Sequence, residues 1–591
     1  MESKVTSISI KKSFFSNYKW AFIPVLLGFL LYSNTFNHGF VLDDNLVTQD
    51  KFVVNGLKNI TDLFTEKTLP EVGNIKPYRP ITAVSFALDY SLFKTDNPDV
   101  MASKLHIMNV FYFCLSLLFS FVFVKKLFKS DTIAIAVSCL FASHPLHVEV
   151  VANIKSRDEI LAFLFGFISL IFYQKYCELK SKKWLYMTLV FYFIAILSKE
   201  SAILFLLVFP MVKFYLDDKK LIFRDLQLLI LPALAYLLIQ RMVLGITLMP
   251  KMTEIDNMLV GITNASDNLA TRFYLVGLYL YKLLIPNTLL YDYSINYISV
   301  KTFASPEVWA SILALFLLIY FTYKGIINKN KIAFGALFMI IMFLLTCNLF
   351  ISIGATFAER FTFTPSFGFV IAISIMAFEL VKKLKQKSYF ALLVLLPILL
   401  FYSFKTYSRN KDWKSNAVLF TNDYKNCSKS LRIQNNYASV FYQQTKKTVD
   451  TIEKKKLMLK SISILDTVTI NYPNYIEAYL QKGICFLEIK DCENAIKNFE
   501  IAKKIGKYNF NIESNLGIGY INCGRSNEAV GIFSRLLNED KTQEKFYLRN
   551  LGVAYYNVKN IDSSSFYFTM LKDRYPNDEE VDNYLQQDSN N

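Results

Sequence analysis

The residues best suited to chemistry follow the first apolar segment directly, in the stretch His38-Gly39-Phe40-Val41-Leu42-Asp43-Asp44-Asn45. Two adjacent carboxylates at the edge of an apolar wall could relay protons or bind a metal. They could also supply the general base that deprotonates a hydroxyl acceptor when a sugar leaves a lipid phosphate. Asp43 and Asp44 are therefore the candidate catalytic residues.

Other polar residues recur at the ends of later apolar segments. The candidate substrate- and donor-binding residues are Arg79, His106, Asn109, His144, His147, Glu149, Arg157, Asp158, Lys199, Glu200, Glu359 and Arg360. The basic members suit an anionic phosphate, because a guanidinium grips phosphate oxygens in pairs and an ammonium supplies a point charge. A single pair such as Lys199 and Glu200 could equally tie two helices together. Carboxylates at membrane depth are costly, so a whole set on one side favours a functional site.

A metal site is a second interpretation of part of this set. His144-x-x-His147 followed by Glu149 could supply metal ligands. Pro145 between the two histidines argues against the helical spacing that zinc peptidases use. The metal requirement stays open, and a divalent metal is possible but is not the expected cofactor.

The composition indicates the class of protein. The chain has 591 residues, 53% of them hydrophobic, and a formal net charge of +17. Lysines and arginines fall in small clusters between long apolar runs, which the positive-inside bias explains more simply than nucleic-acid binding. The sequence therefore predicts an all-α, multi-pass membrane protein that does not bind nucleic acid.

The hydropathy pattern predicts about eleven membrane-spanning helices. Their ranges are 20–37, 103–124, 132–152, 158–175, 184–199, 201–216, 222–244, 306–324, 332–352, 362–381 and 388–405. Lysine-rich connections at every second turn predict a cytoplasmic N-terminus, an outer loop over 38–102 and an outward C-terminal tail. Residues 245–305 are expected to form one outer region. Its segment 272–286 would dip into or lie along the membrane, because a full crossing would break the alternation of charge.

The polar tail carries an internal repeat of 34 to 35 residues. Two residue types follow this period, namely Gly483, Gly517 and Gly552, and Phe499, Phe533 and Phe568. This is the tetratricopeptide period, in which small residues let paired helices approach closely. Three clear repeats are predicted, preceded by a degenerate one between about 436 and 473. The eight cysteines show no legible disulfide framework.

The order and spacing of several short motifs resemble one known family. The motifs are Phe40-Val41-Leu42-Asp43-Asp44, Tyr78-Arg79-Pro80-Ile81, His106-x-x-Asn109-Val110, His144-Pro145-Leu146-His147-Val148-Glu149, Arg157-Asp158, Lys199-Glu200, Ala358-Glu359-Arg360-Phe361 and Pro365-Ser366-x-Gly368-Phe369. Together they resemble the transmembrane and tetratricopeptide-repeat O-mannosyltransferases, the TMTC family, over nearly the whole chain. Residues 245–305 resemble the DUF1736 segment of that family.

The resemblance implies an architecture and an activity. The architecture is a GT-C-type transmembrane domain over 1–405 and a tetratricopeptide-repeat α-solenoid over 406–591. The activity is inverting transfer of a sugar, mannose in that family, from a polyprenyl or dolichyl phosphate to a protein Ser or Thr hydroxyl on the non-cytoplasmic face. The role of the base in the first outer loop falls on Asp43 or Asp44, while His144, His147, Glu149 and Asp158 would shape the pocket.

The resemblance also implies partners and a location. The repeats would present the acceptor protein or dock another partner. The short tail and the Lys-, Asn- and Ile-rich composition suggest a bacterial homologue, with the helices in the inner membrane and the repeats in the periplasm. In a eukaryote the repeats would lie in the lumen of the endoplasmic reticulum.

Two other classes of function stay open. A lipid or ion transporter or flippase could use charges within the membrane as its path, but the acids gather at one face and no inverted repeat is visible. A non-catalytic assembly factor would use the repeats to bind and the helices as an anchor. An anchor does not require about eleven spans or the outer polar set.

Overall fold

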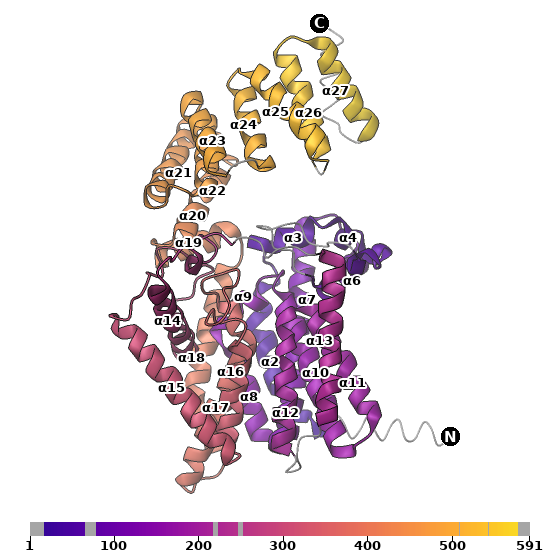
Figure 1. Ribbon diagram of the computed structural model, residues 1–591, viewed down its shortest axis with the longest axis vertical. Helices are drawn as coiled ribbons and strands as arrows, with labels where there is room; N and C mark the ends of the chain where they lie inside the picture. The colour runs from indigo at the N-terminus through magenta and orange to yellow at the C-terminus, as the bar shows by residue number, and fades with distance from the viewer. Residues whose placement is uncertain are drawn as a thin grey trace. The chain divides into compact units, whose positions relative to one another are not determined.

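The computed structural model describes residues 17–65, 78–216, 223–245, 252–506, 509–541 and 543–576. The chain divides into two compact units, Met1–Asn426 and Cys427–Asn591. The described residues of both units are helical and contain no β-strand, which confirms the all-α prediction. Figure 1 shows the long helices of the first unit lying side by side.

The first unit is built on the helices that correspond to the apolar segments. They are α2 (Phe22–Tyr32), α7 (Pro98–Phe128), α8 (Asp131–Ser143), α9 (Val148–Val151), α10 (Arg157–Leu179), α11 (Lys182–Ser198), α12 (Phe205–Leu216), α13 (Phe223–Leu244), α14 (Ala265–Leu284), α15 (Pro306–Ile327), α16 (Lys331–Phe343), α17 (Phe363–Lys383) and α18 (Phe390–Asp412). Each predicted span coincides with a helix or with a helix and its adjoining turns. The helix α18 continues past residue 405, where the sequence placed the end of the membrane domain.

Fewer helices are long and apolar enough to span a membrane than the hydropathy pattern predicts. Six helices in the described part are long and apolar enough, or seven if the bent pair of α8 with Pro145–Val151 forms one span. The other predicted spans are shorter helices, such as α2 with 11 residues and α16 with 13. The helix α14, which covers most of the ambiguous segment 272–286, is not among the six. The number of about eleven crossings stays a prediction.

The helices differ in how much apolar surface they bury. The most apolar window of α10 or α17 is 67% buried inside the protein, whereas that of α15 is 11% buried. Because a membrane helix needs no protein cover for its apolar side chains, α15 is the kind of helix that lipid surrounds. The helices α10 and α17 form the interior of the bundle and provide the rigid frame for the residues at its ends.

Close packing in this interior relies on aromatic rings and glycine. Phe163 stacks on Phe141 with ring centroids 4.9 Å apart and on Phe167 at 4.2 Å. At the crossing of α16 and α17, a Cβ added to Gly335 would lie 2.5 Å from the carbonyl oxygen of Gly368. Two glycines therefore let these helix backbones touch, as small residues do in membrane bundles.

Short helices and 3₁₀ turns join the long helices. The short helices and the two longer ones that flank the membrane helices are α3 (Asn45–Thr48), α4 (Lys51–Val54), α5 (Asp62–Thr65), α6 (Pro80–Phe93) and α19 (Asn416–Asn426). The 3₁₀ turns are Lys19–Ala21, Ser33–Thr35, Leu42–Asp44, Gly56–Asn59, Pro145–His147, Glu200–Leu204, Met258–Val260 and Glu359–Thr362. Many of the polar residues singled out in the sequence lie in these turns.

The second unit is a row of helix pairs. Its helices are α20 (Leu431–Thr445), α21 (Thr451–Asn471), α22 (Ile476–Glu488), α23 (Cys492–Gly506), α24 (Phe510–Asn522), α25 (Ser526–Glu539), α26 (Glu544–Asn557) and α27 (Ile561–Arg574). The periodic glycines and phenylalanines meet within each of the last three pairs. A Cβ on Gly483 would lie 2.4 Å from the ring of Phe499, and the two later pairs repeat this contact. The period of 34 to 35 residues thus records one buried contact per repeat.

A disulfide closes part of this unit. Cys492 at the start of α23 bonds to Cys523 just after α24, across a separation of 31 residues. The sequence did not indicate this bond, because two cysteines in neighbouring repeats form no recognisable pattern. Stable disulfides are typical of proteins outside the cytoplasm.

Candidate active site

The two candidate catalytic carboxylates occupy different environments. Both belong to the 3₁₀ turn Leu42–Asp44, which precedes α3. The Asp44 side chain is fully buried, and its carboxylate accepts hydrogen bonds from the backbone N–H groups of Val41 at 2.9 Å and Lys155 at 2.8 Å. Asp43 is exposed, and no described residue donates a hydrogen bond to its carboxylate. The turn therefore points one acid inward as a structural acceptor and the other outward.

Protonation of Asp44 is set mainly by burial. Loss of solvent raises the pKa of Asp44 to about 7, although the two backbone donors act in the opposite direction. The negative charge of Asp43 adds to the rise in the pKa of Asp44. Because the Asp44 side chain is fully buried, an acceptor hydroxyl cannot reach its carboxylate.

The turn that presents Asp43 contains a strained residue, which two hydrogen bonds support. Leu42 has φ of 52°, in the left-handed region that non-glycine residues rarely adopt. Its N–H donates to the side-chain oxygen of Asn416 at 2.8 Å, while Asp44 fixes the preceding peptide. These two bonds support the strained turn that presents Asp43.

A charge network links three elements around Arg79, which immediately precedes α6. The Arg79 guanidinium pairs with Asp158 and with both oxygens of Glu200, at 2.5 and 2.9 Å. Lys199 binds Asp158 at 3.2 Å and Glu159 at 2.8 Å. The structure thus brings together four of the predicted residues, and it adds Glu159, which the prediction left out although it follows Asp158 directly.

Arg157 is enclosed and does not face this network. Its side chain is fully buried and pairs with the equally buried Asp89 at 2.6 Å. The Nε of Arg157 donates to Asn109 at 2.6 Å, and its guanidinium lies over the ring of Phe86, 4.0 Å from the centroid. A cation enclosed on every side by protein partners cannot reach a ligand without leaving a buried carboxylate unpaired.

Asn109 connects this pair to the catalytic turn. Its amide donates to the carbonyl oxygens of Asn153 at 3.2 Å and Ile154 at 3.3 Å. Asn153 donates in turn to the carbonyl of Val41 at 3.4 Å. The connection between α9 and α10 is therefore tied to both α7 and the turn that carries Asp43.

The remaining predicted acids form two further pairs. Glu149 accepts from the Arg360 backbone N–H at 2.8 Å and pairs with the Arg360 guanidinium, and 30% of the Arg360 side chain is exposed. Glu359 is buried and accepts from the Tyr293 hydroxyl at 2.5 Å and the Leu290 N–H at 2.8 Å. Glu359 thus fixes the region that follows α14, whereas Arg360 keeps part of its surface free.

The three predicted histidines are buried and bonded to protein groups. His106 contacts the carbonyl oxygen of Gly39 at 3.3 Å, His144 that of Leu283 at 3.2 Å, and His147 the Ser366 hydroxyl at 2.8 Å. No group of three or more His, Cys, Asp or Glu in the described residues could hold a metal ion. These histidines join segments that are distant in the sequence.

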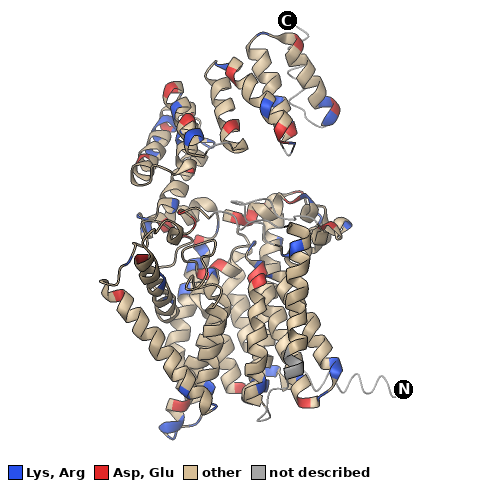
Figure 2. Cartoon of the chain, in the orientation of Figure 1, with Lys and Arg blue, Asp and Glu red and all other residues tan. Residues whose placement is uncertain are grey.

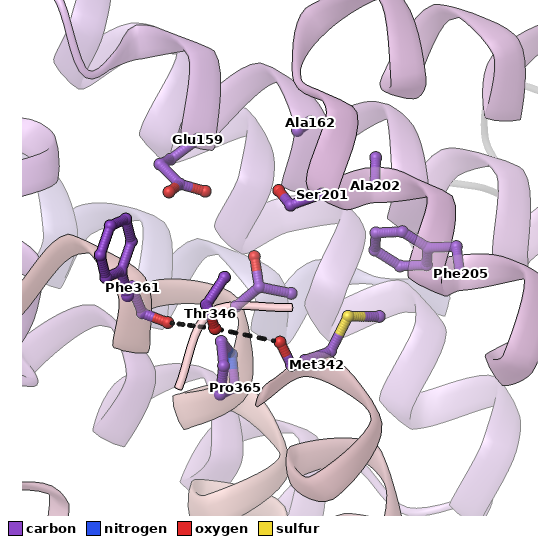
Figure 3. Close-up of a pocket in the computed structure, with 10 residues that line it drawn as sticks. Glu159, Ala162, Ser201, Ala202, Phe205, Met342, Thr346, Phe361 and Pro365 are labelled. Atoms are coloured by element: carbon purple, nitrogen blue, oxygen red, sulfur yellow. Dashed lines mark hydrogen bonds between the residues drawn. The ribbon is translucent and has the colours of Figure 1, made fainter. Parts of the chain in front are cut away.

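Two cavities adjoin the charge network. One has a volume of about 20 Å³, and Figure 3 shows Glu159 and Ser201 among its lining residues, near Thr346. The other also has a volume of about 20 Å³ and is lined by Lys155, Arg79, Asp158 and mainly apolar residues of α3, α4 and α6. Figure 2 shows acidic and basic residues gathered where α3, α4 and α6 lie, and a second charged set at the opposite end of the bundle.

Curated proteins similar to this chain share one description. The protein O-mannosyl-transferase F38B6.6 of Caenorhabditis elegans is 27% identical over 427 residues, which is 71% of this chain. Human protein O-mannosyl-transferase TMTC3 is 25% identical over 80% of this chain, and tmtc2 of Xenopus laevis is 25% identical over 68%. The chain is a homologue of the TMTC protein O-mannosyl-transferases. This finding confirms the resemblance that the motifs indicated.

The likeness to the TMTC proteins covers only part of them. The chain spans 59%, 54% and 57% of the length of these three relatives, so little more than half of each is represented. No protein-family model matches the chain.

Proposed function

We propose that this chain is a membrane glycosyltransferase that moves a sugar, mannose by analogy with its relatives' names, from a polyprenyl phosphate to a protein Ser or Thr hydroxyl. The names of the TMTC relatives support the reaction class. The single observation that carries the proposal is the exposed Asp43 carboxylate, presented on a strained turn next to a charge network. A free acid held in this way is suited to accept a proton.

The proposed reaction divides the roles of the two acids. Asp43 accepts the proton of the acceptor hydroxyl as its oxygen attacks the anomeric carbon of the donor sugar. The bond from that carbon to the phosphate oxygen breaks, and the lipid phosphate leaves with the electron pair, so the configuration inverts. Asp44 does not touch substrate in this scheme, but it positions the turn through its two backbone hydrogen bonds.

We also propose that both the site and the repeat unit lie on the non-cytoplasmic side. The disulfide between Cys492 and Cys523 supports this side for the repeats, since the bond persists outside reducing compartments. The lysine-rich loops assigned to the cytoplasm support the same orientation. In a bacterium the repeats would face the periplasm, where they would present the acceptor protein.

The function is tested by sugar transfer with purified protein. Polyprenyl phosphates carrying mannose, glucose or N-acetylglucosamine are offered with a Ser- and Thr-rich peptide, and product is identified by mass spectrometry. We expect transfer of mannose by the wild type and its loss in Asp43→Asn. Absence of transfer from every donor by folded wild-type protein would refute the proposed function.

The orientation is tested separately by labelling of single cysteines. Glu453→Cys places an exposed thiol on the second unit, and Asn328→Cys places one on a loop assigned to the cytoplasm. In intact cells an impermeant maleimide should label the first variant and not the second. The reverse pattern would refute the proposed orientation.

A further inference from the structure

Lys155 lies beside the candidate catalytic turn and was not among the residues singled out in the sequence. It belongs to the connection between α9 and α10, and its backbone N–H donates to Asp44 at 2.8 Å. Its side chain is half-buried and lines the small cavity beside α3, α4 and α6 together with Arg79 and Asp158. The Asp44 carboxylate therefore holds the backbone N–H groups of both Val41 and Lys155.

The Lys155 ammonium has no carboxylate partner among the described residues. Asp158 is close enough to interact with it electrostatically, but one oxygen of Asp158 accepts from Arg79 and the other from Lys199. Asp43 is the other acid within electrostatic range, and it makes no hydrogen bond to Lys155. Burial lowers the pKa of Lys155, which reflects the cost of a charge that lacks a partner.

The other cations of the site are already neutralised. Arg79 pairs with two carboxylates, as does Lys199, and the charge of Arg157 is enclosed with Asp89. Arg360 pairs with one carboxylate and keeps 30% of its side chain exposed. Of the described cations in this site, Lys155 therefore carries the charge with the least compensation.

A half-buried ammonium without a carboxylate partner is suited to bind an anion. An ammonium supplies a compact charge and three donors, and a hydrogen bond to a phosphate oxygen is stronger when both groups are charged. Asp43, like Asp158, lies within electrostatic range of Lys155, and Asp43 also lies within electrostatic range of Arg360. An anionic group held by Lys155 would thus lie next to the proposed base.

We propose that Lys155 binds the phosphate of the lipid-linked sugar donor, within electrostatic range of Asp43. This assignment rests on the proposed glycosyl transfer for the identity of the phosphate. Lys155 holds the donor so that the bond to the sugar faces Asp43, and it stabilises the phosphate as that group leaves. Arg79 and Lys199, which the sequence suggested for this task, shape the wall of the site through their carboxylate pairs.

The test measures binding of farnesyl phosphate, a short polyprenyl phosphate, to the purified full chain in detergent. The variants are Lys155→Met and Lys155→Arg, with Lys58→Met as a control, since Lys58 is an exposed lysine of the predicted outer loop over 38–102. The Kd of farnesyl phosphate should rise about 10-fold to 100-fold in Lys155→Met, less in Lys155→Arg, and remain unchanged in Lys58→Met. Melting temperature without ligand shows whether each variant is folded.

Further probes separate the possible sources of the phosphate. Farnesol should not bind through Lys155, because it lacks the charge. Inorganic phosphate and phosphatidylglycerol should compete poorly with farnesyl phosphate. Equal competition by phosphatidylglycerol would overturn the assignment, because Lys155 would then bind any anionic lipid headgroup.

Transfer kinetics separate this proposal from the proposed function. If wild type transfers sugar and folded Lys155→Met keeps the wild-type Kd and donor KM, the role of Lys155 is refuted and the transferase stands. If farnesyl phosphate binding depends on Lys155 but no donor sugar is transferred, the phosphate site stands and the transferase is refuted.

Discussion

Exchange of each neighbouring acid for its amide should separate catalysis from stability. Asp44→Asn keeps one acceptor oxygen but turns the other position into an amide that faces a backbone N–H. Since the side chain of Asp44 is fully buried, one of its two backbone donors loses its partner. Leaving such a donor unsatisfied costs about 1 to 3 kcal/mol of folding free energy.

Asp43→Asn should lower the rate of sugar transfer and leave the stability of the protein nearly unchanged. The Asp43 side chain is exposed and has no hydrogen-bond partner among the described residues, so stability should change by less than about 0.5 kcal/mol. Loss of a general base should lower the rate of sugar transfer about 10²-fold to 10⁴-fold. Asp96→Asn, at an exposed acid of the same outer loop, is the matched control and should change neither quantity.

Two measurements on the same detergent preparation decide the matter. Thermal or denaturant unfolding reports stability, and transfer from polyprenyl phosphate mannose reports activity. If Asp43→Asn unfolds much earlier than wild type, or if Asp44→Asn loses all transfer while its stability is unchanged, the division of roles is wrong. A stable, fully active Asp43→Asn would remove Asp43 from the reaction altogether.

Three further changes probe the frame around the site. Cys523→Ser should destabilise the repeat unit by about 3 kcal/mol, measured by unfolding of the full chain. Added reductant should lower the stability of the wild type and leave that of the variant unchanged. Arg157→Met leaves the buried Asp89 carboxylate unpaired and should lower the free energy of unfolding by about 3 to 5 kcal/mol. The double variant with Asp89→Leu should recover much of that stability. Strict additivity of the two changes in a double-mutant cycle would contradict a direct pair. The guanidinium beside Glu200 lowers the pKa of that carboxyl from 4.5 to about 2, so its stabilising contribution is present above pH 4.5 and is lost as pH falls toward 2. Glu200→Gln should flatten this acid-side decline in melting temperature, and an unchanged slope would show that Glu200 is not its source.

The sequence predicted the architecture well because hydropathy and period report local burial. Apolar runs of membrane length gave the positions of the long helices, and the 34-residue period gave the repeats. The same signals do not report which groups meet. Arg157 was a donor-binding candidate by type, but its partner Asp89 lies 68 residues earlier in the chain, and only the fold brings them together.

In the candidate site, too, the sequence could not show which groups meet or where each side chain points. Sequence order placed Asp43 and Asp44 side by side and left the identity of the base open. The 3₁₀ turn directs one side chain into the protein and the other outward, which no residue type could indicate. Lys155 was missed for a related reason, since a lysine becomes informative only when its neighbouring carboxylates are seen to be occupied.

The two backbone hydrogen bonds that Asp44 accepts affect how the candidate site should respond to membrane thickness. Spanning helices tilt or shift when the hydrocarbon thickness around them changes. The Val41 and Lys155 peptides are joined by one carboxylate rather than through those helices, so their separation does not follow the tilt. We therefore expect Asp44 to act as a local spacer, and the proposed transfer to depend little on the acyl-chain length of the surrounding lipid.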